Sequence, residues 1–216
     1  MARVVFFDLD GTLYENRELK WRMPLSAFGG PGALRNLRLM AAERGCRRTI
    51  ARGPQGLAGY DTLFSLMSAK TGIPADEVRR WFHEWYMPRM VREIALHCKP
   101  REGVVARIED LRLEGVRVAI LSDYGFIREK LDALGIDPGL FEALLDAPSL
   151  GGFKPSPDVF RAACQCLDCA PQDALMVGDR PDTDGGSEAV GVRFLNIKDI
   201  NMLEEKPSIS GTDLPV

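Results

Sequence analysis

Residues 4–13 read VVFFDLDGTL, and this stretch decides the fold. Its four consecutive apolar residues, two of them β-branched, predict a short strand that is buried on both faces. Two carboxylates, Asp8 and Asp10, follow at the carboxyl end of the strand, and Gly11 then turns the chain. In open parallel α/β sheets, this edge of the sheet is where ligands bind. Because two acids this close together need a counter-charge, we expect a hard cation there, and Mg²⁺ matches best.

Composition and charge exclude several classes of function. The chain has 216 residues, 45% of them hydrophobic, which allows one large domain or a core with a modest insertion. The net charge is −3, with 28 basic and 31 acidic residues, so the chain lacks the electrostatic footprint of a nucleic-acid-binding protein. No apolar run approaches the ~18 residues of a membrane span, and the first residues lack a signal-peptide pattern. We therefore expect a cytoplasmic protein that binds neither nucleic acid nor membrane; the sequence does not indicate its oligomeric state.

The chain has five cysteines, and an odd number without a secretory signal argues against a disulfide framework. Three of them, Cys164, Cys166 and Cys169, cluster at the end of a helical pattern. Two interpretations of this cluster stay open. We favour structural thiols that pack as small apolar side chains over a metal or redox site, because no second Cys/His pair lies at zinc spacing.

Helices and loops, without a convincing strand, are predicted from residue 15 to residue 99. Apolar residues recur there at helical spacing, and glycine- and proline-rich stretches interrupt the pattern. Trp81, Phe82 and Trp85 lie on one helical face, where packing explains them better than a ligand site. The expected helices cover 33–44, 62–70 and 74–96, with Pro88 kinking or ending the last one, and the expected breaks lie at 29–32 and 52–59.

From residue 100 onward, predicted strands and helices alternate, which implies a parallel sheet with right-handed crossovers. We therefore predict an α/β fold, a Rossmann-like doubly wound parallel sheet formed by residues 1–14 and 100–216. Residues 15–99 interrupt the alternation and are expected to form an inserted helical cap domain over the edge of the sheet. The expected strands are 116–121, 141–145, 174–177 and 192–196, and the expected helices are 104–113, 127–134, 157–166 and 184–190, followed by a tail beyond residue 200.

Polar residues follow several of these strands. Ser122 and Asp123 end the second strand, Lys154 lies in the loop after the third, and Asp179 and Asp184 follow the fourth. If the first and fourth strands are neighbours across a topological switch point, Asp8, Asp10 and Asp179 converge. That arrangement would give a cation site with only oxygen ligands, which suits Mg²⁺.

Four short motifs in this order resemble those of the haloacid dehalogenase (HAD) superfamily. They are DLDGTL at 8–13, LSD at 121–123, GFKP at 152–155, and VGD at 177–179 followed by Asp184. The match spans nearly the whole α/β core, and residues 15–99 resemble the helical cap of that superfamily. Four motifs in order, each at a predicted strand end or loop, are far more specific than one alone.

The resemblance implies a phosphatase that uses Mg²⁺. Asp8 would be the nucleophile that attacks phosphorus and forms an aspartyl-phosphate. Asp10 would act as general acid toward the leaving oxygen and then as general base toward water. The metal would be held by Asp8, Asp179 and the backbone carbonyl of Asp10, and Asp184 would ligate it or support it.

The resemblance also assigns roles around the phosphoryl group. Thr12 and Ser122 would donate hydrogen bonds to its oxygens, and Lys154 would neutralise charge on Asp8 and on the phosphoryl group. Asp123 is a candidate substrate-binding residue, although capping of the following helix is the interpretation we favour. Basic residues in the predicted cap could recognise an anionic substrate or could be solvated; they are Arg17, Lys20, Arg22, Arg47, Arg48 and Arg52.

The leading hypothesis is therefore hydrolysis of a small phosphorylated metabolite. A phosphomutase or phosphotransferase is the nearer alternative because it shares both Asp8 and Asp10. The dehalogenases of this superfamily lack the second acid, so Asp10 argues against that chemistry. A module that keeps the fold without turnover is less favoured, because every expected catalytic position is filled. The sequence does not identify the substrate.

Overall fold

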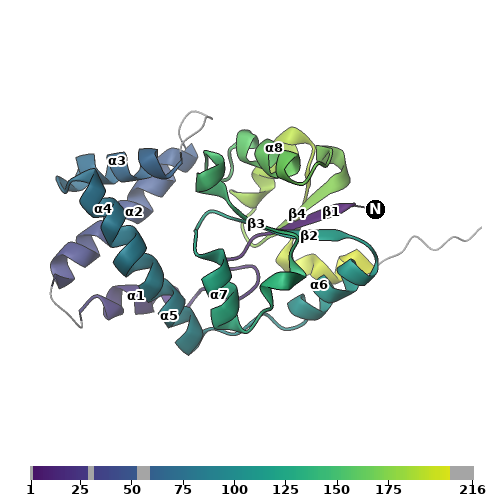
Figure 1. Ribbon diagram of the computed structural model, residues 1–216, viewed down its shortest axis with the longest axis horizontal. Helices are drawn as coiled ribbons and strands as arrows, with labels where there is room; N and C mark the ends of the chain where they lie inside the picture. The colour runs from purple at the N-terminus through teal and green to yellow at the C-terminus, as the bar shows by residue number, and fades with distance from the viewer. Residues whose placement is uncertain (1, 29–31, 53–58, 205–216) are drawn as a thin grey trace, which may run out of the picture.

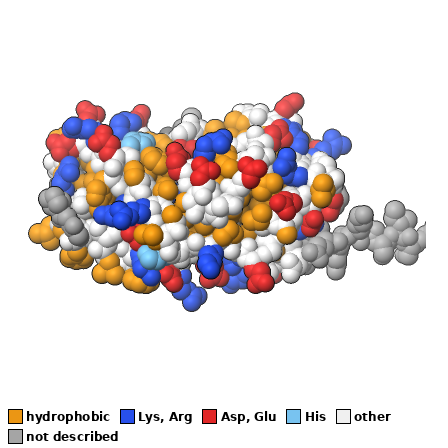
Figure 2. Space-filling view, turned by 60° about the horizontal axis from the view of Figure 1, so that its bottom comes forward, with side chains coloured by type: hydrophobic (Ala, Val, Ile, Leu, Met, Phe, Trp, Pro, Cys, Tyr) orange, Lys and Arg blue, Asp and Glu red, His pale blue; other side chains and the backbone are white. Residues whose placement is uncertain are grey.

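The computed structural model describes residues 2–28, 32–52 and 59–204 (Figure 1). A five-stranded parallel sheet lies beside a group of helices that come from between the first two strands. Within the described residues, no helix is long and apolar enough to cross a membrane. On the face shown in Figure 2, acidic and basic side chains are interspersed, so that face has no continuous basic patch.

The sheet confirms the predicted fold class. Its order is β3-β2-β1-β4-β5, and all neighbouring strands are parallel. The central strand β1 pairs with β2 on one side and with β4 on the other, so the strand order reverses there. The strands are β1 (Val4–Phe7), β2 (Arg117–Ser122), β3 (Ala143–Asp146), β4 (Ala174–Gly178) and β5 (Arg193–Asn196).

Helices cover both faces of the sheet, which explains why β1 is apolar at every position. Val4 and Phe6 pack in a cluster with residues of α8, whereas Val5 and Phe7 pack in a second cluster with residues of α6 and α7. Figure 1 shows α8 on one side of the sheet and α6 on the other. These helices are α6 (Val104–Leu113), α7 (Ile127–Leu134) and α8 (Pro157–Cys166).

The described residues between 19 and 97 form five α-helices and one π-helical turn, which together we call the helical segment. Its apolar residues join the α6 and α7 cluster, so a continuous core connects it to the sheet. Its strongest contact with the α/β part is between α5 and α7. The helices are α1 (Leu19–Ser26), α2 (Ala33–Arg52), α3 (Tyr60–Thr71), α4 (Ala75–Trp81) and α5 (Met87–His97).

The helical segment differs from the sequence prediction in two helices. Helix α1 was not predicted, because its mixed polar residues give no clear periodicity. Helix α2 runs to Arg52 instead of ending near residue 44, and Gly45 lies inside it. A Cβ at Gly45 would lie 2.6 Å from Nζ of Lys70, so the glycine accommodates a side chain of the neighbouring helix α3. Of the expected breaks at 29–32 and 52–59, residues 29–31 and 53–58 lie outside the described residues, and Arg52 belongs to α2.

The aromatic stripe packs inside the helical segment, as predicted. A π-helical turn, η1 (Phe82–Tyr86), joins α4 to α5, and Pro88 occupies the first turn of α5, where its missing N–H costs little. Trp81 is buried; its ring stacks on Trp85 and on Tyr86, with centroids 5.9 and 5.0 Å away.

Short helices connect or follow the strands in the described part of the chain. Residues 184–190 form the predicted short helix, which is a 3₁₀ helix, and a further 3₁₀ stretch extends past residue 200, where a tail was expected. The short helices are η2 (Pro138–Leu140), η3 (Ala147–Leu150), η4 (Pro171–Asp173), η5 (Asp184–Val190) and η6 (Ile197–Glu204).

Candidate active site

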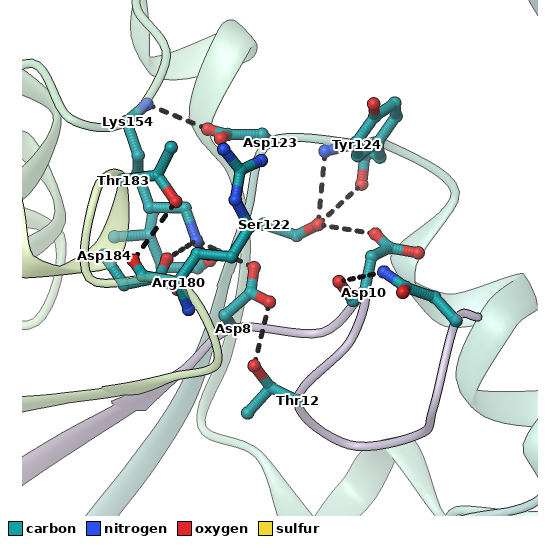
Figure 3. Close-up of polar contacts among 12 residues, drawn as sticks. Asp8, Asp10, Thr12, Ser122, Asp123, Tyr124, Lys154, Arg180, Thr183 and Asp184 are labelled. Carbon is teal, nitrogen blue, oxygen red and sulfur yellow. Dashed lines mark hydrogen bonds and ion pairs between the residues drawn. The ribbon is translucent and has the colours of Figure 1, made fainter. Parts of the chain in front are cut away.

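Asp8 follows β1 directly and is the centre of the site. Its N–H donates to the Val177 carbonyl at 2.9 Å, which continues the pairing of β1 with β4 by one residue. Its carboxylate is buried between two donors: the Thr12 hydroxyl lies 3.0 Å from Oδ2 and the Lys154 ammonium lies 2.7 Å from Oδ1 (Figure 3). Burial raises the pKa of Asp8, although the charge of Lys154 opposes this shift.

Asp179 and Asp184 meet Asp8, as the strand order predicts for Asp179. One carboxylate oxygen from each of the three residues lies within 4.8 Å of the others. Among the described residues, this is the one group of three acidic, histidine or cysteine side chains close enough to share a metal ion. Burial raises the pKa of both Asp179 and Asp184. Three hard oxygen donors around a common point match the ligand preference of Mg²⁺.

Two glycines make this convergence possible. A Cβ at Gly11, whose φ is +112°, would lie 2.6 Å from Oδ2 of Asp179. A Cβ at Gly178 would overlap the carboxylate of Asp184. The turn after β1 and the end of β4 therefore need residues without a side chain in order to admit the acids.

Lys154 lies in the loop before α8 and joins two of the acids. Its buried ammonium donates to Asp8 at 2.7 Å and to Oδ1 of Asp184 at 2.6 Å, and the Leu121 carbonyl accepts at 3.1 Å. Burial alone would lower the pKa of Lys154, but the negative charges of Asp184 and Asp8 outweigh it and raise the pKa. Gly186 lets η5 approach this loop, because a Cβ there would lie 2.6 Å from the Pro155 carbonyl oxygen.

Asp10 lies beside the carboxylate group but is not part of it. Its carboxylate accepts from the Tyr14 hydroxyl at 2.5 Å and from the Lys130 ammonium at 3.0 and 2.8 Å. The Ser122 hydroxyl lies 3.2 Å from its Oδ2. Its backbone carbonyl, predicted as a metal ligand, accepts a hydrogen bond from the Asn16 amide at 2.8 Å.

Sequence reasoning did not identify Lys130, which comes from α7 and is fully buried. A signal was present: Ile127, Lys130, Leu131 and Leu134 have the spacing of an apolar helical stripe, and lysine occupies one of its buried positions. A cation in such a stripe requires an acidic partner, and Asp10 provides it.

Asp123 does not cap the following helix, so that interpretation is wrong. Helix α7 begins only after Phe126, without a side-chain cap. The Asp123 carboxylate instead accepts the backbone N–H of Lys154 at 2.9 Å and so fixes the loop that carries the lysine. Burial raises the pKa of Asp123.

Arg101, which follows the helical segment, holds the loop after Asp10. Its guanidinium donates to the Gly11 carbonyl at 2.9 Å and to the Thr12 carbonyl at 3.1 Å. It also forms an ion pair with Glu15 at 3.2 Å. The return of the chain into the α/β part therefore fixes the turn that carries Thr12.

Two side chains of the helical segment reach the loops of the site. Arg47 is buried, pairs with Glu43 and donates to the Asp123 carbonyl at 2.8 Å, while its guanidinium lies 4.0 Å from the ring centre of Tyr124. The Tyr60 hydroxyl donates to Asp146 at 3.1 Å and accepts from the backbone of residue 125. The α/β part therefore holds the helical segment through polar contacts as well as apolar packing.

The other basic candidates lie in different settings. Arg17, Lys20 and Arg48 are exposed. Arg22 is partly buried, pairs with Glu18 and stacks on Trp21. The side chain of Arg52 lies outside the described residues.

The cysteines stay separate from this chemistry. All five are free thiols. Cys164 is buried, which raises its pKa to about 12, and burial also raises the pKa of Cys169. Raised pKa values disfavour the thiolate form that metal binding and redox chemistry need, in keeping with the favoured structural interpretation.

A family model described as haloacid dehalogenase-like hydrolase matches residues 2–187. The chain belongs to this family. The matched region contains all four motifs of this HAD-like hydrolase, including Asp8, Asp10, Lys154, Asp179 and Asp184.

This hydrolase aligns with very different shares of the lengths of its curated relatives. Protein SUPPRESSOR OF QUENCHING 1, chloroplastic, of Arabidopsis thaliana is 23% identical over 90% of this chain, which spans only 18% of that protein. The pyrophosphatase PpaX of Bacillus cereus is 27% identical over 86% of this chain and 78% of its own length. The N-acetylmuramic acid 6-phosphate phosphatase of Pseudomonas putida is 25% identical over 99% of this chain and 91% of its own.

Solved structures show the same fold. CbbY of Rhodobacter sphaeroides, in complex with phosphate, has a TM-score of 0.64 and 21% identity over 91% of this chain and 86% of its own. The L-2-haloacid dehalogenase of Xanthobacter autotrophicus has a TM-score of 0.57 and 17% identity over 90% of this chain and 76% of its own. At these identities the likeness concerns the fold alone, so the chemistry must be argued from the site.

Proposed function

We propose that this hydrolase is a Mg²⁺-dependent phosphatase that acts on a small phosphorylated metabolite through an aspartyl-phosphate on Asp8. The observation that carries the proposal is the convergence of Asp8, Asp179 and Asp184 around one point, with Lys154 bridging Asp8 and Asp184. The two relatives named as phosphatase and pyrophosphatase, which align over most of their lengths, support the substrate class.

The residues present fit a magnesium ion. Asp8, Asp179 and Asp184 supply hard oxygen donors within 4.8 Å of one another, and glycines at both turns leave room for them. The backbone carbonyl of Asp10 is the fourth proposed ligand, and it would exchange its hydrogen bond from Asn16 for the metal. When bound, the ion supplies positive charge that offsets the repulsion between the Asp8 carboxylate and a phosphate dianion.

The chain's own residues would carry the steps. Asp8, oriented by Lys154 and Thr12, attacks phosphorus and takes over the phosphoryl group. Asp10 protonates the leaving oxygen and then removes a proton from the water that hydrolyses the intermediate.

The groups around the nucleophile would stabilise the phosphoryl group. The Thr12 and Ser122 hydroxyls turn toward its oxygens, and Lys154 balances the charge that builds up. Asp123 stays a candidate for substrate contact, although its carboxylate now holds the Lys154 loop.

We further propose that residues 15–99 act as a cap domain on a core formed by residues 1–14 and 100–216. Arg47 and Tyr60 link the helical segment to loops that carry site residues, so its position would control access and exclude water. The cytoplasm is the compartment we propose for this activity.

The experiment is hydrolysis of a generic aryl phosphate by the purified, folded protein, with and without Mg²⁺. We expect phosphate release that EDTA abolishes and added Mg²⁺ restores. A panel of phosphorylated metabolites then identifies the substrate class. Absence of magnesium-dependent release from every ester in the panel would refute the proposal.

A further inference from the structure

Lys130 is fully buried, and its contacts go to the acid–base candidate of the site. Its ammonium lies 3.0 and 2.8 Å from the two carboxylate oxygens of Asp10. Burying an ammonium is costly, and the ion pair with Asp10, rather than apolar packing of α7, offsets that cost. The position therefore carries a charge that packing does not require.

The hydroxyls of two other residues also contact the carboxylate of Asp10. The Tyr14 hydroxyl donates to Oδ1, and the Ser122 hydroxyl lies within reach of Oδ2. The ammonium of Lys130 contacts both oxygens and lies 5.2 Å from the ring centre of Tyr124. Donors on both oxygens hold the plane of the carboxylate, which would otherwise turn about its terminal bond.

We propose that Lys130 is a positioning residue for proton transfer to the leaving group. This inference rests on the proposed phosphatase function and extends it. Lys130 acts through Asp10: it holds the carboxyl group in one orientation, so that the protonated oxygen lies within about 2.6–3.2 Å of the leaving-group oxygen. The proton passes from Asp10 to that oxygen as the ester bond breaks, and the ammonium of Lys130 stabilises the carboxylate that remains. The side chain of Lys130 itself is sealed from solvent and contacts Asp10 and the ring of Tyr124.

The test is Lys130→Met, which keeps most of the side-chain volume and removes the donor. The readout is kcat/KM for two aryl phosphates, because this constant covers the steps up to departure of the leaving group. Phenyl phosphate needs a proton on its leaving oxygen, and we expect a fall of about 10- to 100-fold. Dinitrophenyl phosphate has a leaving group that departs without one, and its kcat/KM is expected to stay close to that of the wild type.

Two controls separate positioning from a structural role. Arg128→Met removes an exposed cation from the same helix and is expected to leave both substrates unaffected. The double variant Asp10→Ala with Lys130→Met is expected to be no slower than Asp10→Ala alone, because residues that act as a unit are not additive. If the methionine variant does not fold, Lys130→Gln, which retains a donor, takes its place, with a smaller fall of the same pattern.

The outcomes are distinct. An equal loss on both substrates, no loss on either, or an additive double variant overturns the role of Lys130 while the wild type remains an active phosphatase. A wild type that hydrolyses no phosphate ester refutes the proposed function, and this inference with it.

Discussion

Replacing Lys154 with methionine tests the electrostatic balance of the site. The side chain of Lys154 is 2% exposed, and its ammonium has three acceptors: Asp8 at 2.7 Å, Asp184 at 2.6 Å and the Leu121 carbonyl at 3.1 Å. Removing one partner from a buried ion pair costs about 3–5 kcal/mol. Because Asp8 keeps Thr12 and Asp184 keeps the Arg180 N–H, we expect the lower value, about 3 kcal/mol.

That loss is large enough for a thermal melt. For a domain of this size, about 3 kcal/mol corresponds to a fall of about 6–12 °C in Tm. We expect Mg²⁺ to recover part of it, because a cation bound to the ionised acids supplies the missing charge and stabilises the folded state by mass action. Turnover is expected to fall by about 10²–10³.

The loss should also depend on pH. Burial raises the pKa of Asp8 and Asp184, and Lys154 opposes both shifts, so the variant raises both pKa values further. A carboxyl whose pKa is raised in the folded state above its ordinary value of 3.8 stabilises the fold below pH 3.8. This stabilisation is lost as the pH rises through the raised pKa of the folded state. The stability that Lys154→Met loses relative to the wild type is therefore largest at neutral pH and becomes smaller in acid.

Lys198→Met, which removes an exposed lysine, is the matched control and is expected to melt like the wild type. A Lys154→Met variant that matches the wild type in Tm and turnover would show that the ammonium does not balance the charge of Asp8 and Asp184. So would a deficit that grows as the pH falls.

Three further predictions concern other residues. Asp8→Asn is expected to fold normally and to lose turnover; near-normal rates in a steady-state assay would exclude it as the nucleophile. Gly178→Ala places a Cβ on the Asp184 carboxylate and is expected to lower magnesium affinity in calorimetry, whereas Gly185→Ala meets only ordinary contacts and serves as its control. Asp146→Asn is expected to stabilise the fold at neutral pH, because burial raises the pKa of Asp146, and the gain should vanish below pH 3.8 in pH-dependent denaturation; a gain that persists in acid would contradict this cause.

The sequence identified the parts of the site that depend on strand ends. The apolar run of β1 predicted a strand buried on both faces. The alternation of strands and helices predicted a parallel sheet with Asp8 and Asp179 at one edge, and the structure has both residues there. Lys154 was found through its motif and occupies a central position between two acids. The convergence of Asp8 and Asp179 was predictable because strand ends in a parallel sheet meet regardless of side-chain detail.

The missed features depend on contacts between distant segments. Lys130 looked like an ordinary helical residue until α7 was placed beside Asp10. Arg47 was ambiguous because its partners at residues 123 and 124 lie on another element. Helix α2 continues through Gly45, where the end of the Lys70 side chain from α3 lies close to the glycine. Local propensity carries no information on such neighbours.

The central claim is that Asp8 carries the phosphoryl group. It is tested directly by mixing the enzyme with Mg²⁺ and a phosphate ester that it hydrolyses, and quenching the reaction rapidly. The acyl phosphate is then reduced, and the modified peptide is identified by mass spectrometry. We expect a modified residue in the peptide that contains Asp8, and none in Asp8→Asn. Modification of another residue, or turnover without any trapped intermediate under conditions where hydrolysis of the intermediate limits the rate, would contradict it.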